Sequence, residues 1–184
     1  MWPTWRRDLA ALAAVVALGW FGLRGRVPLL SGVDLGFHEL GHLVCYVLDA
    51  LLPWPEVLTA AAGSFTQVAV PLGLAVYFLG RDRHAAALCL AWAGTSARDV
   101  SVYVADAPYE ALPLLGGHHD WAAVLGPEHL DRLHQAEEIA SVIRGAGVAL
   151  VVAAAVLLVA PVLQWAWRDT PARPPRRSAT GPRV

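Results

Sequence analysis

Five stretches of this 184-residue chain are long and apolar enough to cross a lipid bilayer, which takes roughly 20 residues of helix. They cover approximately residues 9–23, 29–52, 57–79, 85–105 and 148–167. Lipid offers the backbone no hydrogen-bond partner, so only structures that satisfy their own backbone groups can span it. We therefore expect an all-α fold, a polytopic membrane bundle of about five transmembrane helices embedded in a lipid bilayer.

The composition agrees with a membrane protein. Hydrophobic residues make up 57% of the chain and the mean hydropathy is +0.48, which is too apolar for an ordinary soluble domain. The net charge of −1 does not suggest a nucleic-acid partner. All basic residues are arginine, and lysine and asparagine are absent, which is typical of a GC-rich bacterial genome. We expect an integral protein of the bacterial cytoplasmic membrane.

The segments outside these stretches are polar. Residues 106–144 form a long loop whose second half has apolar residues at near-helical spacing, which predicts one amphipathic helix that begins near Pro127. Residues 168–184 are rich in proline and arginine and are predicted to be a disordered tail, after a single membrane-embedded domain of residues 1–167. The distribution of arginines favours a cytoplasmic location of this tail.

The second apolar stretch contains His38-Glu39-Leu40-Gly41-His42. Two histidines four residues apart project from the same face of a helix, so both imidazoles can bind one Zn²⁺ ion. The glutamate between them can act on a water molecule at the metal. Ionisable groups within a membrane are costly and usually functional. The alternative is a buried polar cluster that holds helices together.

A catalytic zinc usually has three protein ligands, so one more is expected from elsewhere in the chain. Asp99 is the first candidate, because it lies inside an apolar stretch and a lone buried carboxylate needs a partner. Its neighbour Arg98 should point in a different direction on a helix, which disfavours a direct ion pair. The other candidates are His119 and Asp120, because the glycines before them would let the loop fold back over the site.

Three further polar residues are candidates for supporting roles. Asp34 lies one turn before His38 and Asp49 two turns after His42, so each suits a contact to the outer nitrogen of an imidazole. Both could equally belong to a polar stripe that packs against another helix. Gln67 lies in the third stretch, whose first half we expect to be irregular, and it is a candidate for aligning an unwound substrate.

The segment Phe37–His42 resembles the signature of the site-2-protease-like membrane zinc metallopeptidases, the M50 family. Residues 63–67, residues 99–107 and residues 119–121 resemble a bacterial subgroup described as M50B-like. The resemblance implies a zinc peptidase that cuts membrane proteins or peptides, in which an aspartate on a later membrane helix completes the zinc site. Asp99 is the best positional match, although the residues around it depart from the family pattern.

The expected activity is therefore peptide hydrolysis by zinc-activated water. His38, His42 and Asp99 would hold the ion, and Glu39 would be the general base. The unusual surroundings of Asp99 support a second interpretation, a zinc-binding membrane scaffold or regulator without catalysis. A metal-ion transporter ranks last, because few other carboxylates lie in the apolar stretches.

Overall fold

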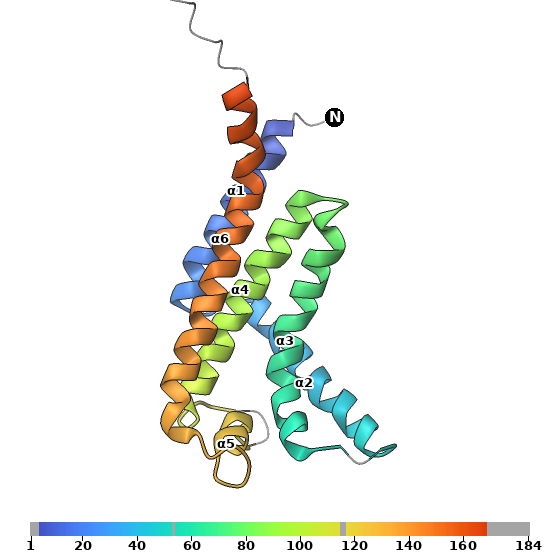
Figure 1. The fold of residues 1–184 in the computed structure, drawn as a ribbon, viewed down its shortest axis with the longest axis vertical. Coiled ribbons are helices and arrows are strands. Elements are labelled where there is room, and N and C mark those ends of the chain that lie inside the picture. Colours follow the sequence, from blue (N-terminus) through green and yellow to red (C-terminus); the bar gives the residue numbers. More distant parts are fainter. Residues whose placement is uncertain (1–3, 53, 115–116, 169–184) are drawn as a thin grey trace, which may run out of the picture.

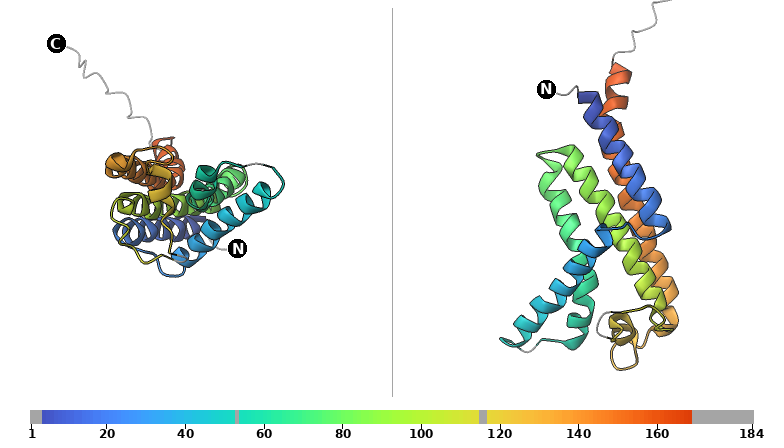
Figure 2. Two further views of the ribbon diagram at one scale, coloured as in Figure 1. Left: turned by 90° about the horizontal axis from the view of Figure 1, so that it is seen from below. Right: turned by 180° about the vertical axis from the view of Figure 1, so that it is seen from behind.

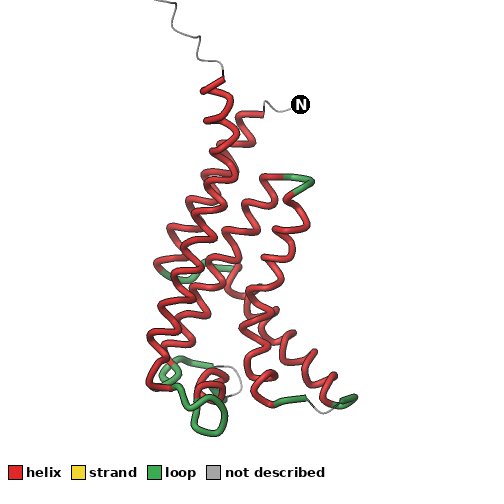
Figure 3. The backbone as a smooth tube through the Cα atoms, in the orientation of Figure 1, coloured by secondary structure: helices red, strands yellow, loops and turns green. Residues whose placement is uncertain are grey.

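The protein is described by a computed structural model, which places residues 4–52, 54–114 and 117–168. All regular secondary structure in these segments is helical, which confirms the expected all-α class (Figure 3). In chain order the elements are α1 (Thr4–Arg24), α2 (Leu30–Asp49), α3 (Glu56–Leu79), α4 (Arg83–Asp106), α5 (Asp120–Leu125), the 3₁₀-helix η1 (Leu133–Gln135) and α6 (Ala136–Arg168). Arg168, the first residue of the predicted tail, is the last residue of α6, and residues 169–184 lie outside the described residues.

Helix α4 is the centre of the bundle and packs against α1, α3 and α6 (Figure 1). Small residues make these approaches possible. A Cβ atom added at Gly94 of α4 would lie 2.6 Å from the carbonyl oxygen of Gly147 in α6, and one added at Gly147 would lie equally close to that of Gly94. Contacts of this kind between backbones are typical of helices packed in membranes.

Helix α2 runs obliquely to the other long helices and extends from the middle of the molecule to one end (Figure 2). It packs mainly against α3. Gly41 of α2 faces the backbone of α3, and a side chain there would clash with the carbonyl oxygen of Ala62. The close approach brings the face of α2 that carries the two histidines against α3.

The segment between α4 and α6 folds back beneath the bundle, at the end where α3 begins and α4 ends (Figure 1). Val124 and Leu125 of α5 are buried in an apolar cluster with Val100 and Val104 of α4 and Ala140 of α6. The short helix α5 is therefore anchored to α4 and α6 by its apolar residues, and it also contacts α3.

Two expectations about local structure were wrong. No separate amphipathic helix begins at Pro127; residues 127–130 form a turn, η1 follows at residues 133–135, and α6 runs without a break from Ala136 through the predicted fifth span. The apolar periodicity at Ile139 and Ile143 belongs to the first turns of α6, where both side chains pack against the cluster around α5. The second wrong expectation was that the first half of the third apolar stretch is irregular. Helix α3 is continuous from Glu56 to Leu79, and Pro71 does not interrupt it.

Two of the described helical segments, Glu56–Leu79 and Leu133–Pro161, are long and apolar enough to cross a membrane. The five expected stretches do coincide with long helices, but α1, α2 and α4 do not meet the same criterion. The charged and imidazole groups of α2 and the Arg98–Asp99 pair of α4 lower their hydropathy. A bundle of five membrane-spanning helices is thus not shown by length and composition alone.

Candidate metal centre

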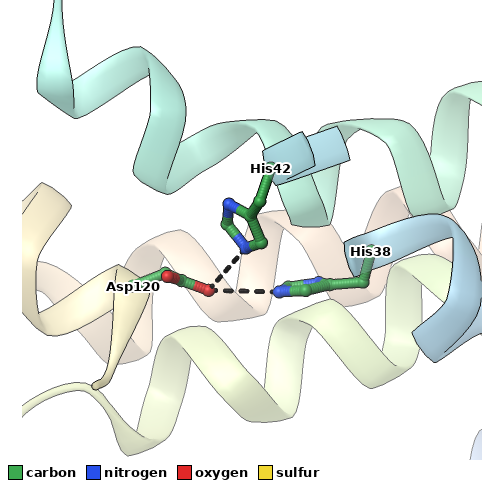
Figure 4. Close-up of side chains that lie close together, drawn as sticks. All are labelled: His38, His42 and Asp120. Carbon is green, nitrogen blue, oxygen red and sulfur yellow. Dashed lines mark hydrogen bonds and ion pairs between the residues drawn. The ribbon is translucent and has the colours of Figure 1, made fainter. Parts of the chain in front are cut away.

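Three side chains from two distant parts of the chain converge below α3 (Figure 4). His38 and His42 lie on successive turns of α2, and Asp120 is the first residue of α5. Oδ2 of Asp120 is 3.1 Å from Nε2 of His38 and 3.2 Å from Nε2 of His42. The potential ligand atoms of all three residues lie within 4.8 Å of one another, and His38 is buried.

The outer nitrogens of both imidazoles face oxygen atoms of α3. Nδ1 of His42 is 2.9 Å from the backbone carbonyl oxygen of Thr59, and Nδ1 of His38 is 3.4 Å from Oε1 of Gln67. Carbonyl oxygens only accept hydrogen bonds, so each Nδ1 carries a proton and donates it. In the neutral form of each ring, the lone pair of Nε2 is then directed toward Asp120.

The donor set fits a metal cation. Two Nε2 lone pairs and a carboxylate oxygen are all acceptors, so their close approach requires a proton or a cation among them. Two imidazoles and one carboxylate are a ligand set found in catalytic zinc sites, where the fourth position remains open. The hydrogen bonds donated by Nδ1 are also the contacts that fix ligating histidines in metal sites. The residues present therefore fit Zn²⁺.

Gly63 allows α3 to pass directly over the two imidazoles. A Cβ atom at this position would lie 2.5 Å from Nε2 of His42 and 2.6 Å from Nε2 of His38. Real Cβ atoms essentially never approach other atoms so closely, and the obstacle here would be two constrained rings. The glycine is therefore required by the geometry of the site.

Asp120 is held by α4. The hydroxyl of Tyr103 donates a hydrogen bond to Oδ2 of Asp120 at 3.1 Å and accepts one from the backbone N–H of Asp120 at 2.9 Å. Burial alone would raise the pKa of Asp120. The contact with His38 and the positive charge that His42 and His38 carry when protonated outweigh burial, and the pKa lies below its usual value.

Two neighbours of Asp120 anchor the start of α5. The indole N–H of Trp121 donates to Oγ of Ser64 on α3 at 2.9 Å. Nδ1 of His119 accepts the backbone N–H of Ala122 at 3.1 Å and so caps the helix. The ring of His119 packs on that of Tyr103 with 4.4 Å between centroids. His119 was a candidate for a metal ligand, and it instead supports the segment that carries Asp120.

Asp99 does not join the histidines. It lies 3.4 Å from the guanidinium of Arg98, so the expectation that these neighbours would not pair was wrong. An arginine side chain is long enough to fold along the helix toward an adjacent residue. Asp34 accepts hydrogen bonds from Trp92 at 2.7 Å and from Ser96 at 2.9 Å, both on α4. It therefore fulfils the second of its two expected roles, a polar contact between packed helices.

The roles predicted for Asp49 and Gln67 compare differently with the structure. Asp49 is exposed near the end of α2, where its carboxylate accepts the backbone N–H of Trp54 at 3.1 Å, and this contact stabilises the turn after the helix. The supporting role predicted for it at the site was wrong, because two helical turns carry it too far along the axis. Gln67 is buried beside His38 and contacts its ring, whereas the alignment of a substrate expected of it stays a prediction.

The metal-ligand candidates open onto a cavity of about 440 Å³ between α2, α4 and the loop that precedes α5. Its wall includes Glu39 of α2, which is exposed to the cavity. Arg98 and Asp99 of α4 also line it. Leu112 and His118 contribute the loop side. Charged side chains therefore line the part of the cavity that borders the candidate metal ligands.

Sequence reasoning missed three contributors to the site. Tyr103 lies in a stretch that resembles the M50B-like subgroup. Neither its distance from Asp120 in the sequence nor its neighbouring residues indicated that the two side chains would be in contact. Thr59 acts through its backbone carbonyl, which no side-chain pattern can reveal. The pair of Ser64 and Trp121 depends on how the loop folds back.

Comparisons with protein-family models, curated proteins and solved structures found no match for this chain.

Proposed function

We propose that this protein is a membrane-embedded zinc metalloendopeptidase that hydrolyses peptide bonds of membrane proteins or peptides. One observation carries the proposal: His38, His42 and Asp120 direct three acceptor atoms toward one point, and Glu39 lines the cavity beside them. The resemblance of residues 37–42 to the M50 signature agrees with this activity. The third ligand in this proposal is Asp120, not Asp99.

The three ligands would hold Zn²⁺ through Nε2 of each histidine and Oδ2 of the aspartate. When bound, the ion would supply the Lewis acid that hydrolysis of a peptide bond needs. Thr59 and Gln67 keep both imidazoles in the tautomer that binds a metal. Tyr103 keeps the carboxylate turned toward them.

Glu39 is the proposed general base. It follows His38 directly in the chain, and its carboxylate borders the cavity rather than the packed interior. The carboxylate takes a proton from the attacking water as the new C–O bond forms. It then gives this proton to the amine nitrogen as the C–N bond breaks, so the base is regenerated after each turnover.

The outer surface supports a membrane location. Large apolar side chains are exposed on several helices, for example Leu43 of α2 (57%), Phe65 of α3 (73%) and Val142 of α6 (73%). Apolar faces of this extent are costly in water and are favourable against lipid. With the two helices long enough to span a bilayer, they support an integral protein, and a bacterial cytoplasmic membrane with the tail on the cytoplasmic side remains part of the proposal.

The test is cleavage of a panel of transmembrane peptides by the purified protein, reconstituted in lipid vesicles with zinc. Glu39→Gln should abolish cleavage and leave zinc bound, because it removes the base and no ligand. Glu128→Gln, which removes an exposed carboxylate in the turns after α5, is the matched control and should cleave as the wild type does. Full activity of Glu39→Gln would overturn the assignment, and a zinc-loaded wild type that cleaves nothing would favour the scaffold.

A further inference from the structure

Tyr103 is the only residue among the described contacts of Asp120 that binds both its backbone and its side chain. The phenol oxygen accepts the backbone N–H of Asp120 at 2.9 Å, and the phenol hydrogen is donated to Oδ2 of the same residue at 3.1 Å. The two bonds close a ring through residue 120. They fix where its backbone lies and how its carboxylate is turned.

The carboxylate oxygen that Tyr103 binds is the one that faces the histidines. Oδ2 of Asp120 lies 3.1 Å from the phenol oxygen, 3.1 Å from Nε2 of His38 and 3.2 Å from Nε2 of His42. A hydrogen bond to one carboxylate oxygen restricts rotation of the group. The phenol thus keeps Oδ2 at the point where the two imidazole lone pairs converge.

Asp120 needs such a restraint because of its place in the chain. The histidines are held by a twenty-residue helix, whereas α5 has six residues and follows an irregular segment. Short helices are marginal without tertiary contacts, and ordering a loop residue costs conformational entropy. Tyr103 belongs to the central helix α4, which is itself packed against three other helices.

We propose that Tyr103 is a positioning residue for the metal centre, which presents Oδ2 of Asp120 to a divalent cation held by His38 and His42. The inference rests on the proposed metal site and adds to it a residue that acts through a ligand. Contacts of this kind to ligating groups typically change metal affinity by about 10- to 100-fold when they are removed. Tyr103 does not itself bind the ion.

The experiment compares Tyr103→Phe with the wild type in detergent, by competition of each protein with a chromophoric chelator for Zn²⁺. Phenylalanine keeps the ring that packs against His119 and removes only the hydroxyl. The control is Tyr46→Phe, which removes a phenol from the wall of the same cavity, one turn beyond His42. A second readout is the visible spectrum of bound Co²⁺, which reports the geometry of the ligands.

We expect Tyr103→Phe to weaken Zn²⁺ binding by about 10-fold or more and to change the Co²⁺ spectrum, while Tyr46→Phe matches the wild type in both. A double-mutant cycle separates positioning from general loss of structure. In the Asp120→Ala background, Tyr103→Phe should have no further effect on the affinity that the two histidines retain. An equal loss in both backgrounds would overturn the proposal.

Two other results have different meanings. A Tyr103→Phe protein with wild-type affinity and an unchanged Co²⁺ spectrum would overturn the positioning role and leave the metal site and the proposed function intact. A wild type that binds neither ion, with the helical content of the folded protein, would overturn both.

Discussion

Oδ2 of Asp120 lies 3.1 Å from Nε2 of His38, although the two residues are 82 positions apart in the chain. The histidine belongs to a long helix and the aspartate to a short one that folds back beneath the bundle (Figures 1 and 4). The candidate metal centre is therefore complete only when α5 is docked. Metal affinity should report on this docking as well as on the ligands themselves.

Gly63 should be important for tight metal binding. In Gly63→Ala the new methyl group would lie 2.5 Å from Nε2 of His42 and 2.6 Å from Nε2 of His38, so the rings or α3 must move. We expect Zn²⁺ affinity to fall by about 10-fold or more, with a loss of stability of about 1–3 kcal/mol from overpacking. Competition with a chelator measures the first effect and thermal unfolding the second.

The control for this variant is Gly73→Ala in the same helix, where an added Cβ would meet nothing within 4 Å. Alanine is the better helix former, so this substitution should leave zinc binding unchanged and not destabilise the protein. Gly63→Ala with wild-type zinc affinity would show that α3 does not press on the imidazoles.

The hydrogen bond from Trp121 to Ser64 should help to hold α5 against α3. Trp121→Phe and Ser64→Ala each remove this bond, which is 2.9 Å long and partly buried. We expect each to cost about 1 kcal/mol in local stability and the double variant to cost less than the sum. Hydrogen exchange of the amides of α5 measures the effect.

Trp54→Phe is the matched control, because the described hydrogen bond of Trp54 uses its backbone rather than its indole. Its amides in α5 should exchange at the wild-type rate. If the effects of Trp121→Phe and Ser64→Ala simply add, the two side chains do not act through a shared bond.

Acid should weaken the N-cap of α4 and, to a smaller extent, the ion pair of Asp82 with Arg7 of α1. Asp82 accepts the backbone N–H groups of His84 and Ala85 and lies 3.3 Å from Arg7 of α1. The hydrogen bond from the backbone of His84 is the main cause of a pKa below the usual 3.8. Because the folded state lowers this pKa, the stabilisation is fully present above pH 3.8 and is lost as the pH falls through the lower folded value.

Asp82→Asn tests this effect, since asparagine can still cap the helix but carries no charge. The variant should have a lower unfolding temperature than the wild type at neutral pH, and the two should converge well below pH 3.8. A difference of the same size at both pH values would mean that the charge of Asp82 contributes nothing.

Much of the architecture follows from the sequence. Long apolar stretches predicted the five long helices, and the spacing of His38 and His42 predicted that they share a helix face. The break between the last two elements was misplaced, because the apolar periodicity around Ile139 continues directly into the last span. A pattern of period 3.6 shows that a helix exists, but it does not show where one helix ends when no breaker intervenes.

The third ligand shows where sequence reasoning stops. Asp99 is an unusual carboxylate in an apolar stretch, which made it the first candidate. Arg98 compensates its charge within the same helix, a possibility that spacing alone disfavoured. Asp120 was recognised as an alternative from the neighbouring glycines. Its selection depends on contacts with Tyr103 of α4 and on the docking of Trp121, which only the tertiary structure provides.

The most direct test of the metal centre is the zinc content of the purified protein after reconstitution with Zn²⁺, with Asp120→Ala and Asp99→Ala measured beside the wild type. The structure predicts about one tightly bound ion per chain in the wild type and in Asp99→Ala, and its loss in Asp120→Ala. Loss of zinc in Asp99→Ala with retention in Asp120→Ala would contradict the site described above.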